Sequence, residues 1–424
     1  MSHRPRAIVV VTGSELVRGE RTDRNGPFYA REALSLGLVP ERIVIVGDDP
    51  NDLEAALRAA EDADICLVSG GLGPTHDDRT VELVARVAGA PLRVDLALET
   101  TIEGISRRVA ERLGRPYGDF APGVTKQATV PEGSVVVGIA GTAPGLVVPG
   151  RRCVYVVMPG PPGELRRLWP AAVASEPVQA VLARTTPPGR RVLRFYGVSE
   201  SAVARALAEA GGDGAGVEAT ICARDFEIHV DLVVEPGAEG RADELERAFL
   251  DPLRRYLFTQ DEQSVAEKVL GLCRARGLRL AAAESCTGGL VAARLTDVPG
   301  SSDVFAGAIV AYANEVKTTQ LGVRPALIEA HGAVSAEVAE AMATGVRERL
   351  AVDVGIAVTG VAGPDGGTEE KPVGLVYLHA AGPDGDLALE FNLPGDRDAI
   401  RGRSAASALH LVRRLLTRNR HEDD

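Results

Sequence analysis

Ser285 stands where a short apolar segment meets a glycine-containing turn, a position at which serines act as nucleophiles. Residues 278–283 predict a buried strand, and the amphipathic residues 290–296 predict the helix that follows it. A serine at such a turn is exposed, and the backbone N–H groups after it can face a developing oxyanion. The alternative is that Ser285 or Thr287 only caps the helix, while the glycines tighten the turn.

Lys317 is a second group that could take part in chemistry, because it follows another apolar segment further along the chain. Residues 308–317 predict a strand that ends in Tyr312, Asn314 and Lys317. One helix, a turn and a strand fit between Ser285 and Lys317, so the two strands could be neighbours in one sheet. A lysine whose pKa is lowered by burial can accept the proton of a serine nucleophile. The alternative is a solvated lysine at the end of a strand.

Polar residues also follow the predicted strands in the first third of the chain. Strand-like and helix-like segments alternate there, which predicts a parallel sheet with a ligand crevice at the carboxyl ends of its strands. The predicted strands are residues 7–12, 42–46 and 65–71, and the predicted helices are residues 26–38, 50–63 and 80–88.

A glycine-rich turn after the third of these strands has the composition of a phosphate-binding loop. The turn contains Gly70, Gly71, Gly73 and Thr75. Backbone N–H groups in such a turn can cradle phosphate, and the carboxylates of Asp77, Asp78 and Glu15 could hold a divalent ion against it. The alternative is a tight turn followed by an acidic pair that complements the helix dipole. The Walker A pattern is absent, so this is not a P-loop.

Six segments near the end of the chain resemble, in one order, the C-terminal domain of the CinA family, which is the nicotinamide mononucleotide deamidase also called PncC. They are AESCTGG, LTDVPGSS, AYANEVK, HGAVS, VTGVAGPDGGTEEKPVG and PGDRDAIR. The resemblance implies that Ser285 is the nucleophile, Lys317 its base and Tyr312 a helper, and that this domain needs no cofactor. It also implies substrate contacts at Thr287, Gly288, Gly289, Asn314, Thr359, Gly360 and Arg397. Cys286 is an alternative nucleophile, because a thiolate is intrinsically the better one.

Arg397 is expected to read the phosphate of the mononucleotide or to position the reacting ring. It lies in a turn that opens the last predicted helix, residues 399–416, where its guanidinium could fork onto phosphate beside the helix N-terminus. The alternative is a surface ion pair with Asp396 or Asp398.

Six further segments resemble the N-terminal domain of the same family, a relative of the molybdopterin-binding proteins MoaB and MogA. They are GSELVRGERTDRNG, GDDP, SGGLGPTHDDRTVE, KQATVPEG, GTAPG and MPGPPGE. The resemblance implies hydrolysis of ADP-ribose to AMP and ribose 5-phosphate with a divalent metal, which could be Mg, Mn or Co. It implies metal ligands at Asp77, Asp78, Glu15 and Glu164, and substrate contacts at Gly70, Gly71, Gly73, Thr75 and Lys126.

These resemblances predict an α/β protein of three domains. Residues 1–170 are expected to form the MoaB/MogA-like parallel-sheet domain, residues 171–258 a small α+β KH-like domain, and residues 259–424 the α/β amidohydrolase domain. The middle segment contains FYGVSES, which resembles the KH-like module of the family. It holds more acidic than basic residues, so a structural spacer is favoured over an RNA clamp. Its predicted strands are residues 192–198 and 226–234, and its predicted helices are residues 201–210 and 241–250.

The net charge and the composition of the chain argue against several classes of protein. A net charge of −12 and a pI near 5.3 argue against nucleic-acid binding, because neutralising phosphates requires clustered Lys and Arg. Five cysteines without CxxC spacing suit a reducing cytoplasm. We expect no signal sequence and no membrane-spanning segment, a homodimer as in the family, and a frayed acidic end at residues 420–424.

The sequence therefore predicts a cytoplasmic, bifunctional hydrolase of pyridine-nucleotide recycling, whose partners are nicotinamide mononucleotide and ADP-ribose. The alternative is a competence- or damage-inducible binding protein, whose molybdopterin-type N-terminal domain holds a ligand without chemistry.

Overall fold

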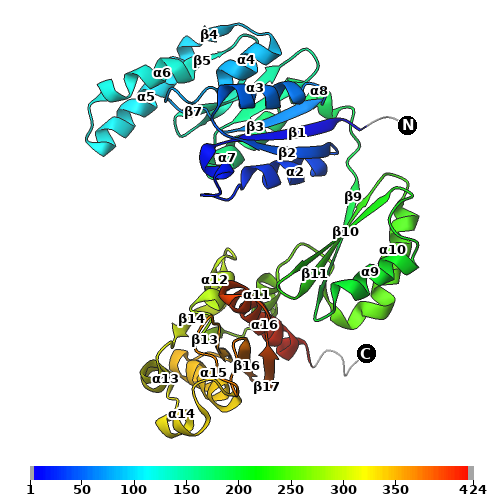
Figure 1. Cartoon of the computed structure of the whole chain (residues 1–424), viewed down its shortest axis with the longest axis vertical. Helices are drawn as coiled ribbons and strands as arrows, with labels where there is room; N and C mark the ends of the chain where they lie inside the picture. Colours follow the sequence, from blue (N-terminus) through cyan, green and yellow to red (C-terminus); the bar gives the residue numbers. More distant parts are fainter. Residues whose placement is uncertain (1–3, 419–424) are drawn as a thin grey trace. The chain divides into compact units, whose positions relative to one another are not determined.

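The computed structural model describes residues 4–418. They form two compact units, which divide between Gly189 and Arg190. The acidic end at residues 420–424 lies outside the described residues. Figure 1 shows that both units combine helices with sheets, so the predicted α/β class is confirmed.

The first unit is built on one six-stranded sheet in the order β2-β1-β3-β8-β7-β6. The first four strands in this order run parallel, and β7 and β6 are each antiparallel to their neighbour. The strands are β1 (Arg6–Thr12), β2 (Val39–Val46), β3 (Ile65–Ser69), β6 (Val135–Ala140), β7 (Ala143–Pro149) and β8 (Val154–Met158).

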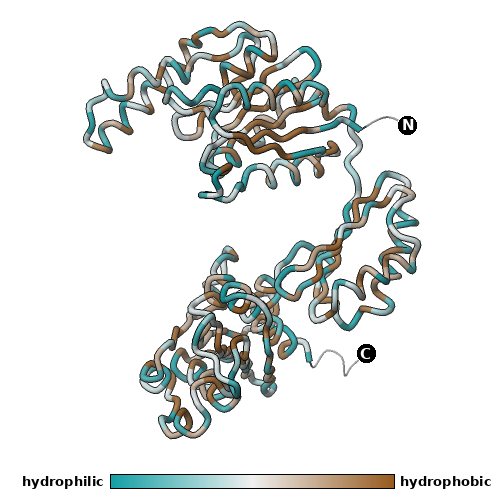
Figure 2. The backbone as a smooth tube through the Cα atoms, in the orientation of Figure 1, coloured by the Kyte–Doolittle hydropathy of each residue, from teal (hydrophilic) through white to brown (hydrophobic). Residues whose placement is uncertain are grey.

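Both faces of this sheet are covered because its central strands are apolar on both sides, as parallel strands commonly are. In β1, Ile8 and Val10 belong to one core, while Val9 and Val11 belong to the other. Figure 2 shows these central strands in the hydrophobic colour. The first core includes α3 (Pro50–Ala59), α4 (Thr80–Ala88) and α5 (Leu96–Leu113), and the second includes α2 (Asn25–Ser35), α7 (Pro162–Val173) and α8 (Glu176–Leu182).

Smaller elements complete the first unit. A two-stranded ladder joins β4 (Leu92–Val94) to β5 (Thr129–Pro131). The helix α6 (Ala121–Ala128) packs against α5, and the short helix α1 (Ser14–Val17) follows β1 directly.

The second unit begins with a four-stranded sheet in the order β10-β11-β9-β12. Its strands are β9 (Gly189–Tyr196), β10 (Val217–Arg224), β11 (Glu227–Val234) and β12 (Leu257–Thr259). The helices α9 (Glu200–Glu209) and α10 (Glu239–Leu253) contribute to a separate core with these strands. Strands β9 and β11 and both helices correspond to predicted segments, whereas β10 was not predicted.

The rest of the second unit surrounds a five-stranded sheet in the order β14-β13-β15-β16-β17. The strands are β13 (Leu280–Glu284), β14 (Phe305–Val310), β15 (Val354–Gly360), β16 (Leu375–Gly382) and β17 (Gly385–Asn392). One core includes α11 (Val265–Ala275), α12 (Leu290–Thr296) and α16 (Arg397–Thr417), and the other includes residues of α13 (Asn314–Leu321), α14 (Pro325–His331) and α15 (Ala336–Leu350). Strand β13 lies between β14 and β15 and is parallel to both, so the predicted neighbouring strands are confirmed.

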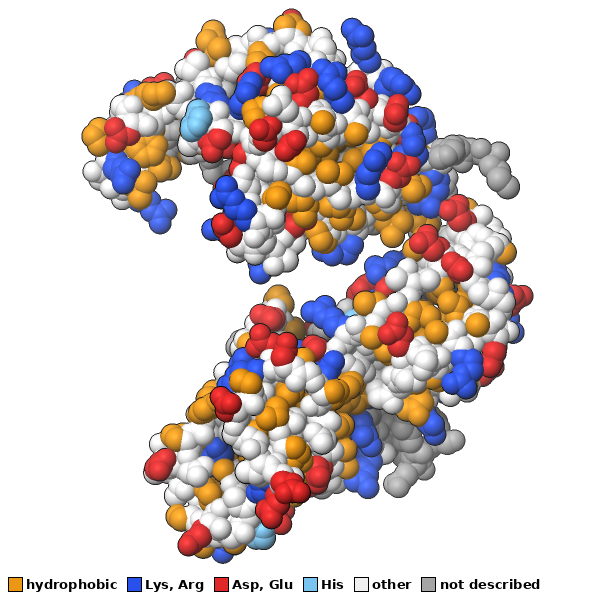
Figure 3. Space-filling model, viewed as in Figure 1, with side chains coloured by type: hydrophobic (Ala, Val, Ile, Leu, Met, Phe, Trp, Pro, Cys, Tyr) orange, Lys and Arg blue, Asp and Glu red, His pale blue; other side chains and the backbone are white. Residues whose placement is uncertain are grey.

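The visible surface carries charges of both signs. On the face drawn in Figure 3, basic and acidic side chains are interspersed in each unit. None of the helices within residues 4–418 is both long enough and apolar enough to span a membrane.

Candidate functional site

The turn after β13 presents Ser285 at the carboxyl end of a central strand. The Ser285 N–H donates to the Val358 carbonyl of β15 at 2.9 Å, which extends the ladder by one residue. The chain then reverses into α12 through Gly288 and Gly289, whose φ values of 59° and 96° lie in the left-handed region that glycine tolerates best. The predicted strand-to-helix turn at Ser285 is therefore present.

Lys317 lies beside this serine. Its Nζ atom is 3.1 Å from Ser285 Oγ, and it donates to the carbonyl oxygens of Ala311 at 2.7 Å and Tyr312 at 3.2 Å. Lys317 is 1% exposed and belongs to α13. The prediction that it ends a strand was wrong, because β14 stops at Val310 and a helix begins at Asn314.

The surroundings of Lys317 suit a general base. Burial lowers the pKa of its ammonium group, and the nearby Cys286 opposes this shift. A neutral amine has two N–H donors and one lone pair. The two backbone carbonyls take the two donors, so the lone pair is left for the Ser285 hydroxyl. The same three partners also accommodate the protonated amine, so a proton can arrive at Nζ without rearrangement of the site.

Glu284, the last residue of β13, holds the start of α12. Its carboxylate is fully buried and accepts three backbone hydrogen bonds, from Gly289 at 3.0 Å, Val291 at 3.1 Å and Ala292 at 2.9 Å. The N-cap residue Gly289 has no side chain that could accept hydrogen bonds from the first N–H groups of the helix. The carboxylate of Glu284, which precedes the helix in the chain, accepts them instead. Sequence reasoning missed this role, although a glutamate within an otherwise apolar strand was a visible signal.

Glu284 also changes which N–H groups can face an oxyanion. Gly289 N–H donates to Glu284, and Gly288 N–H donates to the Ser285 carbonyl at 3.1 Å. The N–H groups of these two glycines are therefore already engaged, and the substrate contacts that the resemblance implies at Gly288 and Gly289 stay predictions. Within residues 4–418, the N–H groups of Cys286 and Thr287 donate to no carbonyl or carboxylate, and both lie against the Cys286 thiol, where they oppose the rise in its pKa that burial causes.

The side chains of Cys286 and Thr287 are both buried. Burial raises the pKa of the Cys286 thiol to about 12, which leaves it protonated and unsuited to act as the nucleophile. The Thr287 hydroxyl has no hydrogen-bond partner within the described residues, and its carbonyl accepts from Arg401 Nη2 at 2.9 Å.

Arg397 and Tyr312 meet at the edge of this site. The Arg397 guanidinium donates to the Tyr312 hydroxyl at 3.0 Å and to the Gly363 carbonyl at 2.6 Å. Arg397 is the first residue of α16, whose N-cap residue is Asp396. Arg397 therefore does not form the alternative surface ion pair with Asp396 or Asp398.

The other predicted contacts of this domain differ in their surroundings. Asn314 is exposed at the start of α13. Thr359 is buried at the end of β15, next to the residue that bonds Ser285, and its hydroxyl donates to the Ala333 carbonyl at 2.8 Å. Gly360 lies against β16, where an added Cβ would meet the Leu375 carbonyl oxygen at 2.7 Å.

The predicted phosphate loop of the first unit folds back on itself. Gly70 and Gly71 have φ values of 106° and 67°, and an added Cβ would collide with Thr12 at the first and with Thr80 at the second. The Thr75 hydroxyl and N–H both bond Asp78, and Lys126 donates to the Thr75 carbonyl. The loop, the lysine and one predicted carboxylate therefore lie together.

Two small cavities adjoin this loop. One of about 290 Å³ is lined by Gly71, Gly73, Asp78 and Glu164. The other, of about 360 Å³, shares the first three of these residues and adds Lys126. Burial raises the pKa of the Glu164 carboxyl.

The four predicted metal ligands do not converge on one point. Asp77 lines neither of these cavities, and Glu15 lines a different one, of about 640 Å³. Among the described residues, no three His, Cys, Asp or Glu side chains are grouped so as to hold a metal ion. Asp78 and Glu164 do line one cavity together, and Mg²⁺ commonly uses one or two carboxylates with substrate phosphates and water. A metal bound with phosphate fits this pair, whereas an all-protein cage does not.

Sequence reasoning missed a buried amide in the larger cavity. Asn25 Nδ2 donates to Ser69 Oγ at 2.8 Å and to the Gly160 carbonyl at 2.7 Å. These three residues line the cavity with Glu15, and they come from three distant segments. The only sequence signal was an asparagine inside one of the motifs quoted above.

Comparisons with known proteins agree with this architecture. The family model described as the CinA C-terminal domain matches residues 262–416, and the model described as a probable molybdopterin binding domain matches residues 8–177. CinA-like proteins of Mycolicibacterium paratuberculosis and Mycobacterium tuberculosis are each 46% identical to this chain. The first match covers 97% of this chain and 98% of the relative, and the second covers 97% of each.

Solved structures resemble part of the chain. The competence/damage inducible protein of Agrobacterium tumefaciens is 37% identical over 37% of this chain and 97% of its own, with a TM-score of 0.34. The CinA protein of Thermoplasma acidophilum is 31% identical over 39% of this chain and 95% of its own, with a TM-score of 0.35. The two domain matches and the relatives that are 46% identical along nearly their whole length establish that this chain belongs to the CinA family.

Proposed function

We propose that the second unit deamidates nicotinamide mononucleotide to nicotinate mononucleotide and ammonia. The observation that carries this proposal is the 3.1 Å approach of Lys317 Nζ to Ser285 Oγ, with both side chains buried and both other donors of the amine directed at carbonyls. This arrangement supplies a nucleophile and a base of lowered pKa in hydrogen-bond contact.

In the proposed reaction, Ser285 Oγ attacks the carboxamide carbon and its proton passes to Lys317 Nζ. The oxyanion of the tetrahedral intermediate accepts hydrogen bonds from the N–H groups of Cys286 and Thr287, which donate to no carbonyl or carboxylate. Lys317 then gives its proton to the leaving nitrogen, and the C–N bond breaks to release ammonia. Water, activated by the neutral Lys317, hydrolyses the resulting ester and frees Ser285.

The remaining side chains are proposed to hold the substrate. Tyr312 is 61% exposed beside the dyad, and its hydroxyl is fixed by Arg397. We assign these two residues, with Asn314, to the side of the site that receives the pyridine ring. Thr359 and Gly360 shape the wall formed by β15.

For the first unit we propose hydrolysis of ADP-ribose to AMP and ribose 5-phosphate. Asp78 and Glu164 would hold a divalent ion, which would neutralise the pyrophosphate charge when bound. The glycine-rich loop would receive the phosphates through its backbone, and Lys126, held at the Thr75 carbonyl, would add a positive charge. The competing function for this unit is binding of a ligand without chemistry, which the match to a probable molybdopterin binding domain favours.

Release of ammonia from nicotinamide mononucleotide by the purified chain tests the main proposal. We expect release by the unaltered chain and none by Ser285→Ala. A chain that releases no ammonia, or a Ser285→Ala variant that releases it at the original rate, would refute the deamidase. We also propose that the chain acts as a cytoplasmic homodimer on small nucleotides rather than on nucleic acid or membranes.

A further inference from the structure

The turn between β10 and β11 has an uncommon backbone. Asp225 and Phe226, at the centre of this two-residue turn, have φ values of 50° and 68°. Tight hairpins with two left-handed residues usually place Asn-Gly there, because a bulky side chain is strained in this region. Such a conformation persists where its surroundings hold it, and it is often found at functional contacts. The backbone of the hairpin tip, defined as residues 224–227, therefore depends on contacts with its surroundings.

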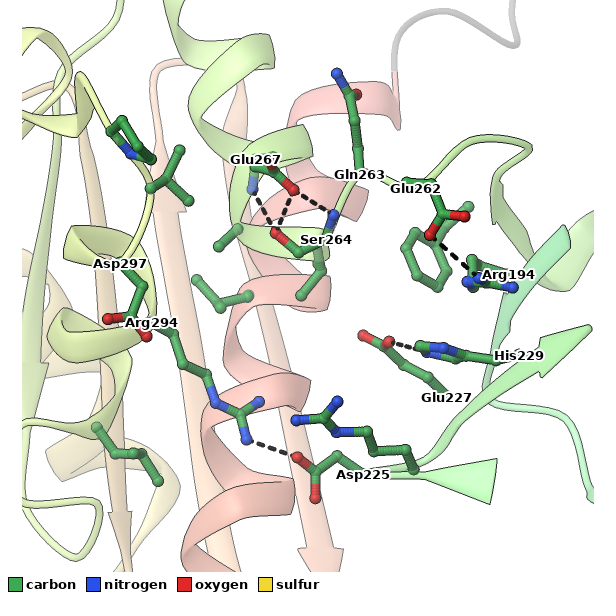
Figure 4. A pocket seen from close by; sticks show the side chains of 18 residues that line it. Arg194, Asp225, Glu227, His229, Glu262, Gln263, Ser264, Glu267, Arg294 and Asp297 are labelled. Carbon is green, nitrogen blue, oxygen red and sulfur yellow. Dashed lines mark hydrogen bonds and ion pairs between the residues drawn. The ribbon is translucent and has the colours of Figure 1, made fainter. Parts of the chain in front are cut away.

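The tip is held by two helices of the neighbouring domain in the same unit. Asp225 Oδ2 forms an ion pair of 2.6 Å with Arg294 Nη2 of α12, as Figure 4 shows. On α16, a Cβ added to Gly402 would be 3.3 Å from Asp225 Oδ1, so the absence of a side chain permits this approach. The Arg403 guanidinium lies 5.2 Å above the Phe226 ring.

These two helices position the proposed deamidase site. Helix α12 begins directly after the turn that carries Ser285, and Arg294 lies on it. Helix α16 begins with Arg397, which bonds Tyr312, and also contains Arg401, which bonds the Thr287 carbonyl at 2.9 Å. One turn of the small domain therefore contacts both helices that hold the nucleophile turn and the substrate side chains.

The contact between the hairpin tip and the two helices covers a small area, because a cavity lies beside the tip. The cavity has a volume of about 710 Å³, and residues of the small domain, of α11 and of α12 line it. Figure 4 shows Asp225 and Arg294 reaching across one end of it, while Glu262 and Arg194 form another pair at a different part of its wall. The side chains of Asp225 and Arg294 keep 30% and 26% of their exposure. Their ion pair can thus be removed without opening a hydrophobic core.

We propose that the hairpin tip braces α12 and α16, and that Asp225 is a positioning residue for deamidation. This inference rests on the proposed function of the second unit. The small domain would then be more than a spacer, because the geometry of the Ser285 turn would depend on its β10–β11 turn.

The test uses the full chain with Asp225→Asn, Arg294→Gln and the double variant. Asparagine keeps the size of the side chain and tolerates positive φ, so only the charge is lost. Asp243→Asn is the matched control, because Asp243 of α10 pairs with Arg191 of β9 at 2.5 Å, so that both partners of this ion pair belong to the small domain. For each variant we would measure kcat and KM for ammonia release, and amide hydrogen exchange in residues 285–296 and 397–403.

We expect kcat to fall about threefold to fivefold in each single variant and no further in the double variant, because a partly exposed ion pair has a small coupling energy. KM should stay unchanged, and exchange in both segments should accelerate by a similar factor. The Asp243→Asn control should match the unaltered chain in all measurements.

Two outcomes separate this inference from the proposed function. The brace would be overturned if the Asp225 and Arg294 variants showed unchanged exchange in both segments and the same kcat as the Asp243→Asn control, even where ammonia is released. Accelerated exchange in a chain that releases no ammonia would support the brace and refute the deamidase.

Discussion

Ser285 and Lys317 should behave as one catalytic unit. Removing either side chain stops the same step, since the serine needs a base and the lysine without Ser285 has no nucleophile to activate. We expect Ser285→Ala, Lys317→Met and the double variant to lose similar deamidase activity, on the order of a thousandfold or more. Steady-state ammonia release, with folding checked by circular dichroism, would measure this.

Cys286 provides the control for this pair. It is adjacent to Ser285, but its thiol is buried and its pKa is raised to about 12. Cys286→Ala should therefore retain most of the activity.

The double variant of Ser285 and Lys317 tests the dyad itself. If its loss of activity were the product of the two single losses, the two residues would have independent roles, which would contradict the dyad.

Arg397 should act through Tyr312 rather than on the phosphate alone. Both terminal nitrogens of its guanidinium are engaged, with Tyr312 and Gly363. We expect Arg397→Lys, which keeps the charge but loses the fork, to lower kcat/KM about tenfold on both nicotinamide mononucleotide and nicotinamide riboside, because bonds to charged groups contribute about 1.5–3 kcal/mol.

Nicotinamide riboside lacks the phosphate, so the comparison of the two substrates is decisive. Tyr312→Phe should reproduce the loss and should add little to Arg397→Lys. A loss confined to the mononucleotide would instead restore the phosphate-reading role expected from the sequence.

At the scale of single residues, the sequence could indicate which groups do chemistry but not how each is satisfied. Ser285 and Lys317 stood out because of their types and their places after apolar segments. Glu284 did not, since its function depends on three N–H groups that meet it only after the chain has turned into α12. For the same reason, the sequence could not show which N–H groups after Ser285 are already engaged within the turn.

At the scale of elements, apolar runs located most of the helices and strands that position the sites. The predicted strand ending at Lys317 failed because periodicity cannot tell a buried helical turn from a strand in so short a segment. Strand β10 was missed because it lies at the edge of its sheet and most of its side chains are partly or fully exposed. Strand order was also out of reach, since it depends on contacts between distant segments.

The contact between the small domain and α16 should make stability depend on pH. His410 of α16 is fully buried, stacks on Tyr196 of β9 and bonds Glu227 of β11 at 2.8 Å. Burial lowers the pKa of its imidazole, Glu227 opposes this shift, and the charges of Arg413 and Arg294 reinforce it. The folded state therefore holds His410 neutral beside an ionised Glu227.

Proton linkage gives the direction in which the stability contributed by His410 changes with pH. In the unfolded chain His410 has a pKa near 6.5, so below about pH 6.5 the unfolded state binds a proton that the folded state does not. Stability from this group is complete above that pH and falls as the pH drops toward the folded pKa. Thermal unfolding of the full chain at pH 7 and pH 5 should show a lower midpoint at pH 5. His410→Gln should narrow the difference, and an equal difference in that variant would contradict this assignment.

At the scale of the whole molecule, the chain joins two candidate sites whose residues suit different kinds of chemistry. The deamidation proposed for the second unit uses a buried amine and backbone amides, and this mechanism needs no ion. The first unit combines a backbone loop, Lys126 and two carboxylates, Asp78 and Glu164, a set that suits a metal-bound pyrophosphate. Because the sites lie in separate compact units, their activities should be separable by reagents and by substitutions.

Removal of divalent ions is the sharpest way to separate them. Chelation should stop ADP-ribose cleavage and leave ammonia release unchanged, since only the pyrophosphate reaction needs its charge neutralised by an ion. A substitution in the cavity that Asp78 and Glu164 share tests the metal site directly. Glu164→Gln should lower ADP-ribose cleavage at least about tenfold, because it keeps the shape of the side chain and removes one proposed ligand.

Asp77→Asn is the matched control for Glu164→Gln. Asp77 lines neither cavity at the loop, so this variant should retain activity. Chromatographic measurement of AMP, run beside the ammonia assay on the same samples, would follow both reactions. Loss of both activities on chelation would contradict the division of chemistry between the units, and equal losses in Glu164→Gln and Asp77→Asn would move the metal away from the cavity that Asp78 and Glu164 share.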